Sequence, residues 1–151
     1  MASTLTRIYI HLIFHVKTTS VKIRVNDLQR LFVYVGGIIK NHDGIPVAIG
    51  GIEDHMHILF ALPKTSAVSE FARIVKANSS RWIKSIDKFY SNFEWQEGYG
   101  AFSVSPTLID KTTDYVLNQA KHHAKRTFID EYKLFLNAYG IKYDEHYAFS
   151  D

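Results

Sequence analysis

The sequence predicts an α+β protein built on an antiparallel sheet, and three observations support this prediction. Residues 7–16 show the two-residue alternation of a strand. Residues 26–43 carry apolar side chains at helical spacing. Two further strand-like runs, 45–52 and 55–62, are separated by only two residues and should therefore form a hairpin.

The first strand divides its side chains between two faces. The more apolar face is expected to meet the core, and it carries Ile8, Ile10, Leu12, Phe14 and Val16. The other face carries Tyr9, His11, Ile13 and His15. In the segment that follows, Asn26 is expected to open a helix, with Gln29 as its capping-box partner.

The remaining elements complete a recognisable order. A second helix is predicted over 66–86 and a short strand over 100–105, followed by a tyrosine-bearing helix over 107–125 and a final helix over 127–140 that Thr127 caps. The order βαββαβ predicts a ferredoxin-like, RRM-like fold with an antiparallel sheet and two helices on one face. We expect such a sheet to leave its other face free for function.

Composition sets limits on the function. The 151 residues are expected to form one domain, 1–151. The absence of cysteine excludes disulfides, thiolate metal sites and a cysteine nucleophile. A formal charge of +3 and a pI of about 9.0 permit an anionic partner without requiring one. The start of the chain lacks signal-peptide features, and no apolar run approaches the ~20 residues that span a bilayer, so we expect a cytoplasmic protein with no membrane contact.

The most informative motif is His55-Met56-His57, at the start of the strand 55–62. Residues two apart on a strand point the same way, so the two histidines should project side by side. Met56 and Ile58 are natural core residues, which favours histidines on the free face. Two neutral imidazoles so placed can hold a divalent metal. The alternative is that they only form hydrogen bonds at a sheet surface.

A second motif lies on the helix predicted over 107–125. Tyr115 and Gln119 are four residues apart and therefore lie on one side of the helix, beside its apolar stripe. On spacing alone, such a tyrosine packs with its hydroxyl in water and such a glutamine is solvated. Their role depends on what else lies near them.

Taken together, these motifs resemble the single-tyrosine HUH transposases, the transposase A of the smallest bacterial insertion sequences, in the IS200-like superfamily. HUH denotes histidine-hydrophobe-histidine. The similarity spans nearly the whole chain, through residues 10–14, 51–59, 76–82, 93–102, 115–119 and 122–123. The histidine pair alone is weakly specific, but this set of segments in this order is highly specific.

The resemblance implies a site and a reaction. His55 and His57 would be metal ligands, Gln119 would supply a third, and Tyr115 would be the nucleophile. The reaction would cleave and rejoin single-stranded DNA with hairpin ends from the protein's own element, through a 5′-phosphotyrosine intermediate. Imidazole and amide ligands suit Mg²⁺ or Mn²⁺, and zinc also fits. The family works as a homodimer in which the tyrosine helix of one subunit completes the site of the other.

DNA would be gripped through its backbone. The basic residues expected to contact it are Arg73, Lys76, Arg81, Lys84, Lys121, His122, His123, Lys125 and Arg126. Bases could stack on Trp95, Tyr99 or Phe102. Two other functions stay open at this point: a non-catalytic single-stranded nucleic-acid-binding module of RRM-like fold, and a metal-dependent hydrolase.

Overall fold

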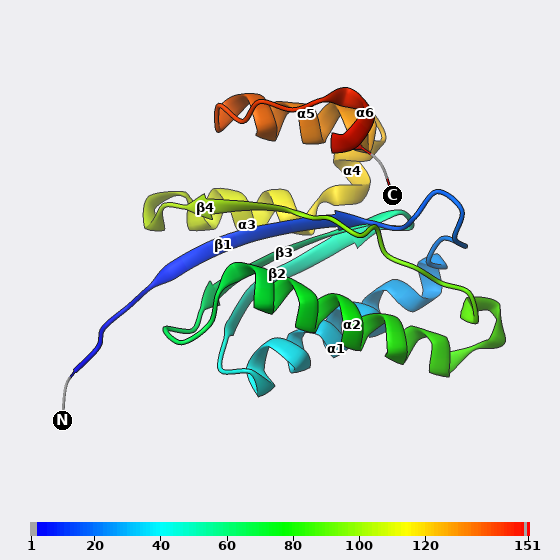
Figure 1. The fold of residues 1–151 in the computed structure, drawn as a ribbon, viewed down its shortest axis with the longest axis horizontal. Helices are drawn as coiled ribbons and strands as arrows, with labels where there is room; N and C mark the ends of the chain where they lie inside the picture. Colours follow the sequence, from blue (N-terminus) through cyan, green and yellow to red (C-terminus); the bar gives the residue numbers. More distant parts are fainter. Residues whose placement is uncertain (1–2, 150) are drawn as a thin grey trace.

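The computed structural model describes residues 3–149 and 151 and has the predicted α+β architecture (Figure 1). One antiparallel sheet has the strand order β2-β3-β1-β4. Its strands are β1 (Ile8–His15), β2 (Ile45–Ile52), β3 (His55–Leu62) and β4 (Gly100–Val104). The first and third strands lie at the centre, which confirms the predicted ferredoxin-like arrangement.

Helices lie on both faces of this sheet (Figure 1). They are α1 (Val25–Asn41), α2 (Val68–Ile86), α3 (Ile109–Leu117), α4 (Gln119–His123), α5 (Phe128–Ala138), α6 (Glu145–Ala148) and the short 3₁₀ helices Lys88–Tyr90 and Pro106–Leu108. Helices α1 and α2 cover one face, and the C-terminal helices lie on the other. Within the described residues, no helix has both the length and the apolarity needed to cross a membrane.

The larger core lies between the sheet and the helices α1 and α2. Alternate strand side chains enter it as predicted, including Phe14 on β1 and Met56 and Ile58 on β3. Ile8 is the exception, because it lies at the start of β1 and is exposed. The two helices contribute apolar residues at helical spacing: Leu31, Val35, Ile38, Phe71 and Val75. Because side chains alternate along a strand, this packing turns His55 and His57 toward the opposite face.

That opposite face is covered, and the prediction that it is free is wrong. Val116 of α3 packs with Ala48 and Leu59, and Tyr132 of α5 packs with Ile13. The helices after β4 carry apolar stripes of their own, and this face of the sheet is where they can be buried. The histidines of the face are therefore each no more than 8% exposed: His11, His15, His55 and His57.

Helix boundaries differ from the predictions for local reasons. Helix α1 begins before Asn26 and has no side-chain cap, so the predicted capping box is wrong. The helix predicted over 107–125 is broken at Asn118, whose side-chain amide donates to the Asp114 backbone oxygen at 2.7 Å. Such side chain–backbone bonds compete with helix continuation. Thr127 caps α5 through its side-chain oxygen, as predicted.

Gly50 on β2 sets how closely α3 approaches the sheet. A β-carbon at this position would lie 2.0 Å from the backbone oxygen of Val116, far inside van der Waals contact. Glycine in a strand often marks such a close backbone approach. Since Val116 follows Tyr115 directly, the bare backbone at Gly50 fixes where the tyrosine helix lies over the sheet.

Replacing Gly50 by alanine is expected to push α3 off β2 and to destabilise the fold by about 1–3 kcal/mol, the usual cost of overpacking. Gly37 on α1 is the matched control, because a β-carbon there meets no atom within 4 Å. Alanine at Gly37 should stabilise the helix by up to about 1 kcal/mol. Urea unfolding measures both effects, and a Gly50→Ala variant as stable as the wild type would contradict the close packing of α3.

Candidate active site

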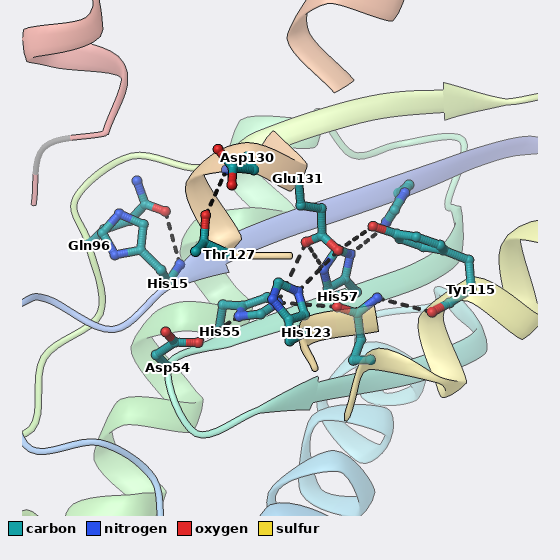
Figure 2. Close-up of polar contacts among 12 residues, drawn as sticks. His15, Asp54, His55, His57, Gln96, Tyr115, His123, Thr127, Asp130 and Glu131 are labelled. Atoms are coloured by element: carbon teal, nitrogen blue, oxygen red, sulfur yellow. Dashed lines mark hydrogen bonds and ion pairs between the residues drawn. The ribbon is translucent and has the colours of Figure 1, made fainter. Parts of the chain in front are cut away.

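The histidine pair of β3 enters a polar cluster beneath the C-terminal helices (Figure 2). His55 Nε2 lies 3.2 Å from Oε1 of Gln119, at the start of α4. His57 Nε2 lies 2.9 Å from Oε1 of Glu131 on α5. The structure thus brings together the three predicted metal ligands, His55, His57 and Gln119, and it adds Glu131 to them.

Glu131 connects the histidine pair to Tyr115 and His123 (Figure 2). Its Oε1 faces the histidine pair, 2.9 Å from His57 Nε2 and 3.6 Å from His55 Nε2. Its Oε2 accepts a hydrogen bond from the Tyr115 hydroxyl and lies 3.1 Å from His123 Nε2. Because Glu131 is only 2% exposed, these contacts replace the water that would otherwise solvate a carboxylate.

Glu131 was not among the predicted site residues, although its position in the sequence indicates a special role. An apolar stripe on α5 packs against β1 and β4 and consists of Phe128, Tyr132 and Phe135. Spacing of three and four residues places Glu131 inside this stripe. A carboxylate is almost never fully buried unless it is paired, so a glutamate at such a position indicates a specific partner.

Hydrogen bonds to residues outside the cluster orient the imidazole rings of His55 and His57. Asp54 Oδ1 lies 2.7 Å from His55 Nδ1, and His11 Nε2 lies 2.8 Å from His57 Nδ1. With Nδ1 engaged in this way, each ring presents Nε2 to the cluster. Contacts of this kind orient the imidazoles that bind metal ions in proteins.

Tyr115 lies at the edge of the same cluster. Its hydroxyl contacts Glu131, its ring meets His57 edge-on with centroids 5.7 Å apart, and the ring of His122 stacks on it at 4.7 Å. Gln119 Nε2 donates to the Tyr115 backbone oxygen at 3.0 Å, which leaves Oε1 facing the histidine pair. The flank position expected for Tyr115 is therefore half-buried, because Glu131 and Phe135 of α5 pack against its ring and hydroxyl.

Burial and mutual contacts set the charges of the cluster. Burial lowers the pKa of His57 to about 4, against the opposing effect of Glu131. Burial alone would raise the pKa of Glu131, but hydrogen bonds from His57 and Tyr115 outweigh it and lower that pKa to about 2. Burial, the hydrogen bond to Glu131 and its charge raise the pKa of Tyr115. At neutral pH the cluster thus holds a neutral imidazole at His57, a carboxylate and an un-ionised phenol.

The donor atoms of the cluster fit a divalent cation. One donor atom from each of His55, His57, His123 and Glu131 lies within 4.8 Å of all the others. Oε1 of Glu131 lies 2.9 Å from His57 Nε2 and 3.6 Å from His55 Nε2, and Oε1 of Gln119 lies 3.2 Å from His55 Nε2. Two ligands at ~2.1 Å and at right angles lie about 3.0 Å apart, so these spacings resemble those of an octahedral shell. Imidazole, amide and carboxylate donors suit Mn²⁺, Mg²⁺ or Zn²⁺.

A basic hollow opens beside Tyr115. It has a volume of about 600 Å³, and its lining consists of Tyr115, Lys121, His122, Ala124, Lys125, Arg126 and Glu131. Four of the residues predicted to contact DNA therefore lie beside Tyr115: Lys121, His122, Lys125 and Arg126. His123, which was predicted with them, faces Glu131 in the cluster instead.

The other predicted DNA contacts lie on α2, on the far side of the sheet from the hollow. Arg73 is ion-paired with Glu70 at 2.6 Å, and Lys76 donates to two backbone oxygens of the loop before β4. Arg81 and Lys84 lie further along the same helix. The structure does not bring these four basic residues to the hollow.

The aromatic residues expected to stack on bases are mostly enclosed. Trp95 is 6% exposed and packs against Phe14 with centroids 4.6 Å apart. Phe102 is 3% exposed and stacks on Phe135 of α5. Tyr99 is half-buried. Trp95 and Phe102 therefore serve as packing residues in this structure.

A model of the family described as "Transposase IS200 like" matches residues 4–119, more than half of the chain. The chain belongs to the IS200-like transposase family. The matched segment of this transposase contains the histidine pair, Tyr115 and Gln119, and it ends before Glu131.

Two solved structures share the fold of this transposase. A Deinococcus radiodurans R1 protein, assigned provisionally as a transposase, superposes with a TM-score of 0.61 at 18% identity, covering 79% of this chain and 95% of its own. A REP-associated tyrosine transposase bound to a REP hairpin superposes with a TM-score of 0.57 at 16% identity, covering 81% and 74%. Similarity at such low identity establishes the fold rather than the function. No curated protein matches the chain.

Proposed function

We propose that this transposase cleaves and rejoins single-stranded DNA at the ends of an insertion sequence, with Tyr115 as nucleophile and a divalent metal at the histidine pair. The observation that carries the proposal is the position of the Tyr115 hydroxyl, between the histidine cluster and the basic hollow. A phosphate in this hollow would meet the nucleophile on the side where the metal ligands gather. Membership of the IS200-like family supports the same reaction.

The proposed reaction is a transesterification. Tyr115 Oη attacks the scissile phosphorus and forms a phosphorus–oxygen bond, while the bond to the sugar 3′ oxygen breaks. The phenol loses its proton and the 3′ oxygen gains one, which gives a 5′-phosphotyrosine link and a free 3′-hydroxyl. The covalent link splits one difficult step into two and keeps the phosphodiester energy for rejoining. Because the hydroxyl donates its hydrogen to Glu131, its lone pairs stay available for attack.

Residues of this chain would hold the metal and orient its ligands. His55, His57 and Gln119 would bind Mg²⁺ or Mn²⁺, and Zn²⁺ also fits this donor set. When bound, the metal supplies positive charge that offsets the negative charge of the phosphate. Asp54 and His11 hold the two imidazoles through their Nδ1 atoms, so the ligand geometry exists before DNA binds.

The basic hollow is the proposed DNA-binding surface at the cleavage point. Lys121, Lys125 and Arg126 would neutralise backbone phosphates on either side of the scissile one. The solved neighbour bound to a REP hairpin supports a substrate with hairpin ends. We infer that the substrate is single-stranded DNA from the ends of the protein's own element.

In this structure all residues of the candidate site come from one chain. Tyr115 and His57 are joined through Glu131 of the same chain, whereas the family resemblance predicts a homodimer in which tyrosine helices are exchanged. We propose that this arrangement within one chain is a catalytic one. Dimerisation is not tested by a single chain and stays a prediction.

Tyr115→Phe removes the attacking oxygen and should reduce covalent protein–DNA adduct by at least about a thousandfold. The assay incubates the protein with labelled single-stranded DNA from the element's ends and Mg²⁺ or Mn²⁺, and separates adducts on a denaturing gel. Tyr34→Phe, on α1 and away from the cluster, is the control and should leave the adduct unchanged.

An adduct that persists in Tyr115→Phe would refute the nucleophile. Metal-dependent cleavage without any adduct in the wild type would favour the hydrolase, and DNA binding without cleavage would favour the binding module.

Mixing Tyr115→Phe with His57→Ala distinguishes the two ways of assembling the site. If each chain uses its own tyrosine and histidines, the mixture should stay as inactive as its components. Recovery of adduct formation in the mixture would show that the tyrosine is supplied by the partner chain. Wild type mixed with Tyr115→Phe controls for subunit exchange.

Lys125→Ala combined with Arg126→Ala should weaken single-stranded DNA binding and lower the slope of log K against log salt by about 0.7 for each phosphate that the protein no longer neutralises. The matched control is Arg73→Ala with Arg81→Ala, which removes two positive charges from α2 on the other side of the sheet. Equal weakening in the two double variants, measured by fluorescence anisotropy across a salt series, would contradict a binding surface centred on the hollow.

A further inference from the structure

We propose that Glu131 is a further ligand of the metal and that its second oxygen holds the Tyr115 hydroxyl in place for attack. This inference rests on the proposed metal site at the histidine pair. It adds a residue from α5, beyond the segment 4–119 that the family model matches, and it makes one carboxylate the connection between metal and nucleophile.

The first observation is that a buried negative charge needs a counter-charge. Glu131 is 2% exposed, and its partners among the described residues are His55, His57, His123 and Tyr115. Buried carboxylates in proteins are paired with a charge or coordinate a metal ion. A divalent cation at the histidine pair would place an opposite charge beside this carboxylate.

The second observation is that the two carboxylate oxygens of Glu131 face different partners. Oε1 lies at 2.9 and 3.6 Å from the Nε2 atoms of His57 and His55. Atoms that share a metal ion at ~2.1 Å are separated by about 3.0 Å at right angles and by about 3.4 Å in a tetrahedral shell. Oε1 is therefore spaced from both imidazole nitrogens as a fellow ligand would be.

Oε2 serves the nucleophile. It accepts the hydrogen bond of the Tyr115 hydroxyl and lies 3.1 Å from His123 Nε2. A hydroxyl held in this way cannot rotate its hydrogen toward the incoming phosphate. Because both oxygens belong to one rigid carboxylate, the position of the metal and the position of the attacking oxygen are fixed relative to each other.

Glu131→Gln tests this assignment, because an amide keeps the shape of the side chain and removes its charge. Mn²⁺ affinity is measured by electron paramagnetic resonance of the free ion, without DNA. We expect Glu131→Gln to bind Mn²⁺ at least about tenfold more weakly than the wild type. Asp130→Asn removes the neighbouring, exposed carboxylate and should change the affinity by less than about twofold.

A second measurement tests whether Glu131 positions the Tyr115 hydroxyl. At saturating Mn²⁺, Glu131→Gln should lower the single-turnover rate of adduct formation by at least about tenfold while leaving single-stranded DNA affinity within about twofold. Near-ultraviolet circular dichroism verifies that the variant is folded. An unchanged rate at saturating Mn²⁺ would overturn the role of Glu131 in holding Tyr115.

Unchanged or tighter Mn²⁺ binding in Glu131→Gln would overturn the ligand assignment. Tighter binding would show that the carboxylate occupies the metal position in the free protein and must leave it when the metal binds. Crystals of the wild-type protein with Mn²⁺ provide a test that does not depend on a variant. The anomalous peak should lie within bonding distance of a Glu131 oxygen, and a peak bonded only to the histidines and Gln119 would overturn the inference.

A different result would contradict the proposed metal site at the histidine pair. If Mn²⁺ binding is unaffected by His57→Ala, the metal is not at the histidine pair and the proposed site itself is wrong. If His57→Ala abolishes binding and Glu131→Gln does not weaken it, the site stands and only the assignment of Glu131 is wrong.

Discussion

A single buried carboxylate is the constraint on which this site depends. Glu131 is almost completely shielded from water, so both of its oxygens must be satisfied by protein groups. The partners come from β3, α3 and α4, through His57, Tyr115 and His123. Removing any one partner would leave a buried charge short of a hydrogen bond, which is costly. The same contacts that stabilise α5 on the sheet therefore also orient the histidines and the tyrosine.

The fold brings these groups together through two backbone features. Gly50 lets the Val116 carbonyl approach β2 so closely that α3 lies directly on the sheet. The break at Asn118 then ends α3 and lets α4 begin at Gln119, whose amide contacts both the Tyr115 backbone and His55. Strand alternation completes the arrangement, because the packing of Met56 in the core leaves the flanking histidines on the other face.

The strands and the histidine face were predictable because alternation is a local property of the sequence. The closed second face was not, since whether α5 covers the sheet depends on contacts between residues such as Ile13 and Tyr132 that lie far apart in the chain. Tyr115 and Gln119 had the right spacing but an ambiguous environment. Glu131 carried a readable signal, a charge within the apolar stripe of α5, yet only the fold shows that it meets the histidine pair.

The most direct test is a nuclear magnetic resonance spectrum of the protein with ¹⁵N-labelled histidine rings during addition of substoichiometric Mn²⁺. The chain contains eight histidines, so each ring reports its own distance from the paramagnetic ion. The account predicts that the signals of His55 and His57 broaden first. Early broadening of the exposed His42 and His122, with the His55 and His57 signals intact, would contradict it.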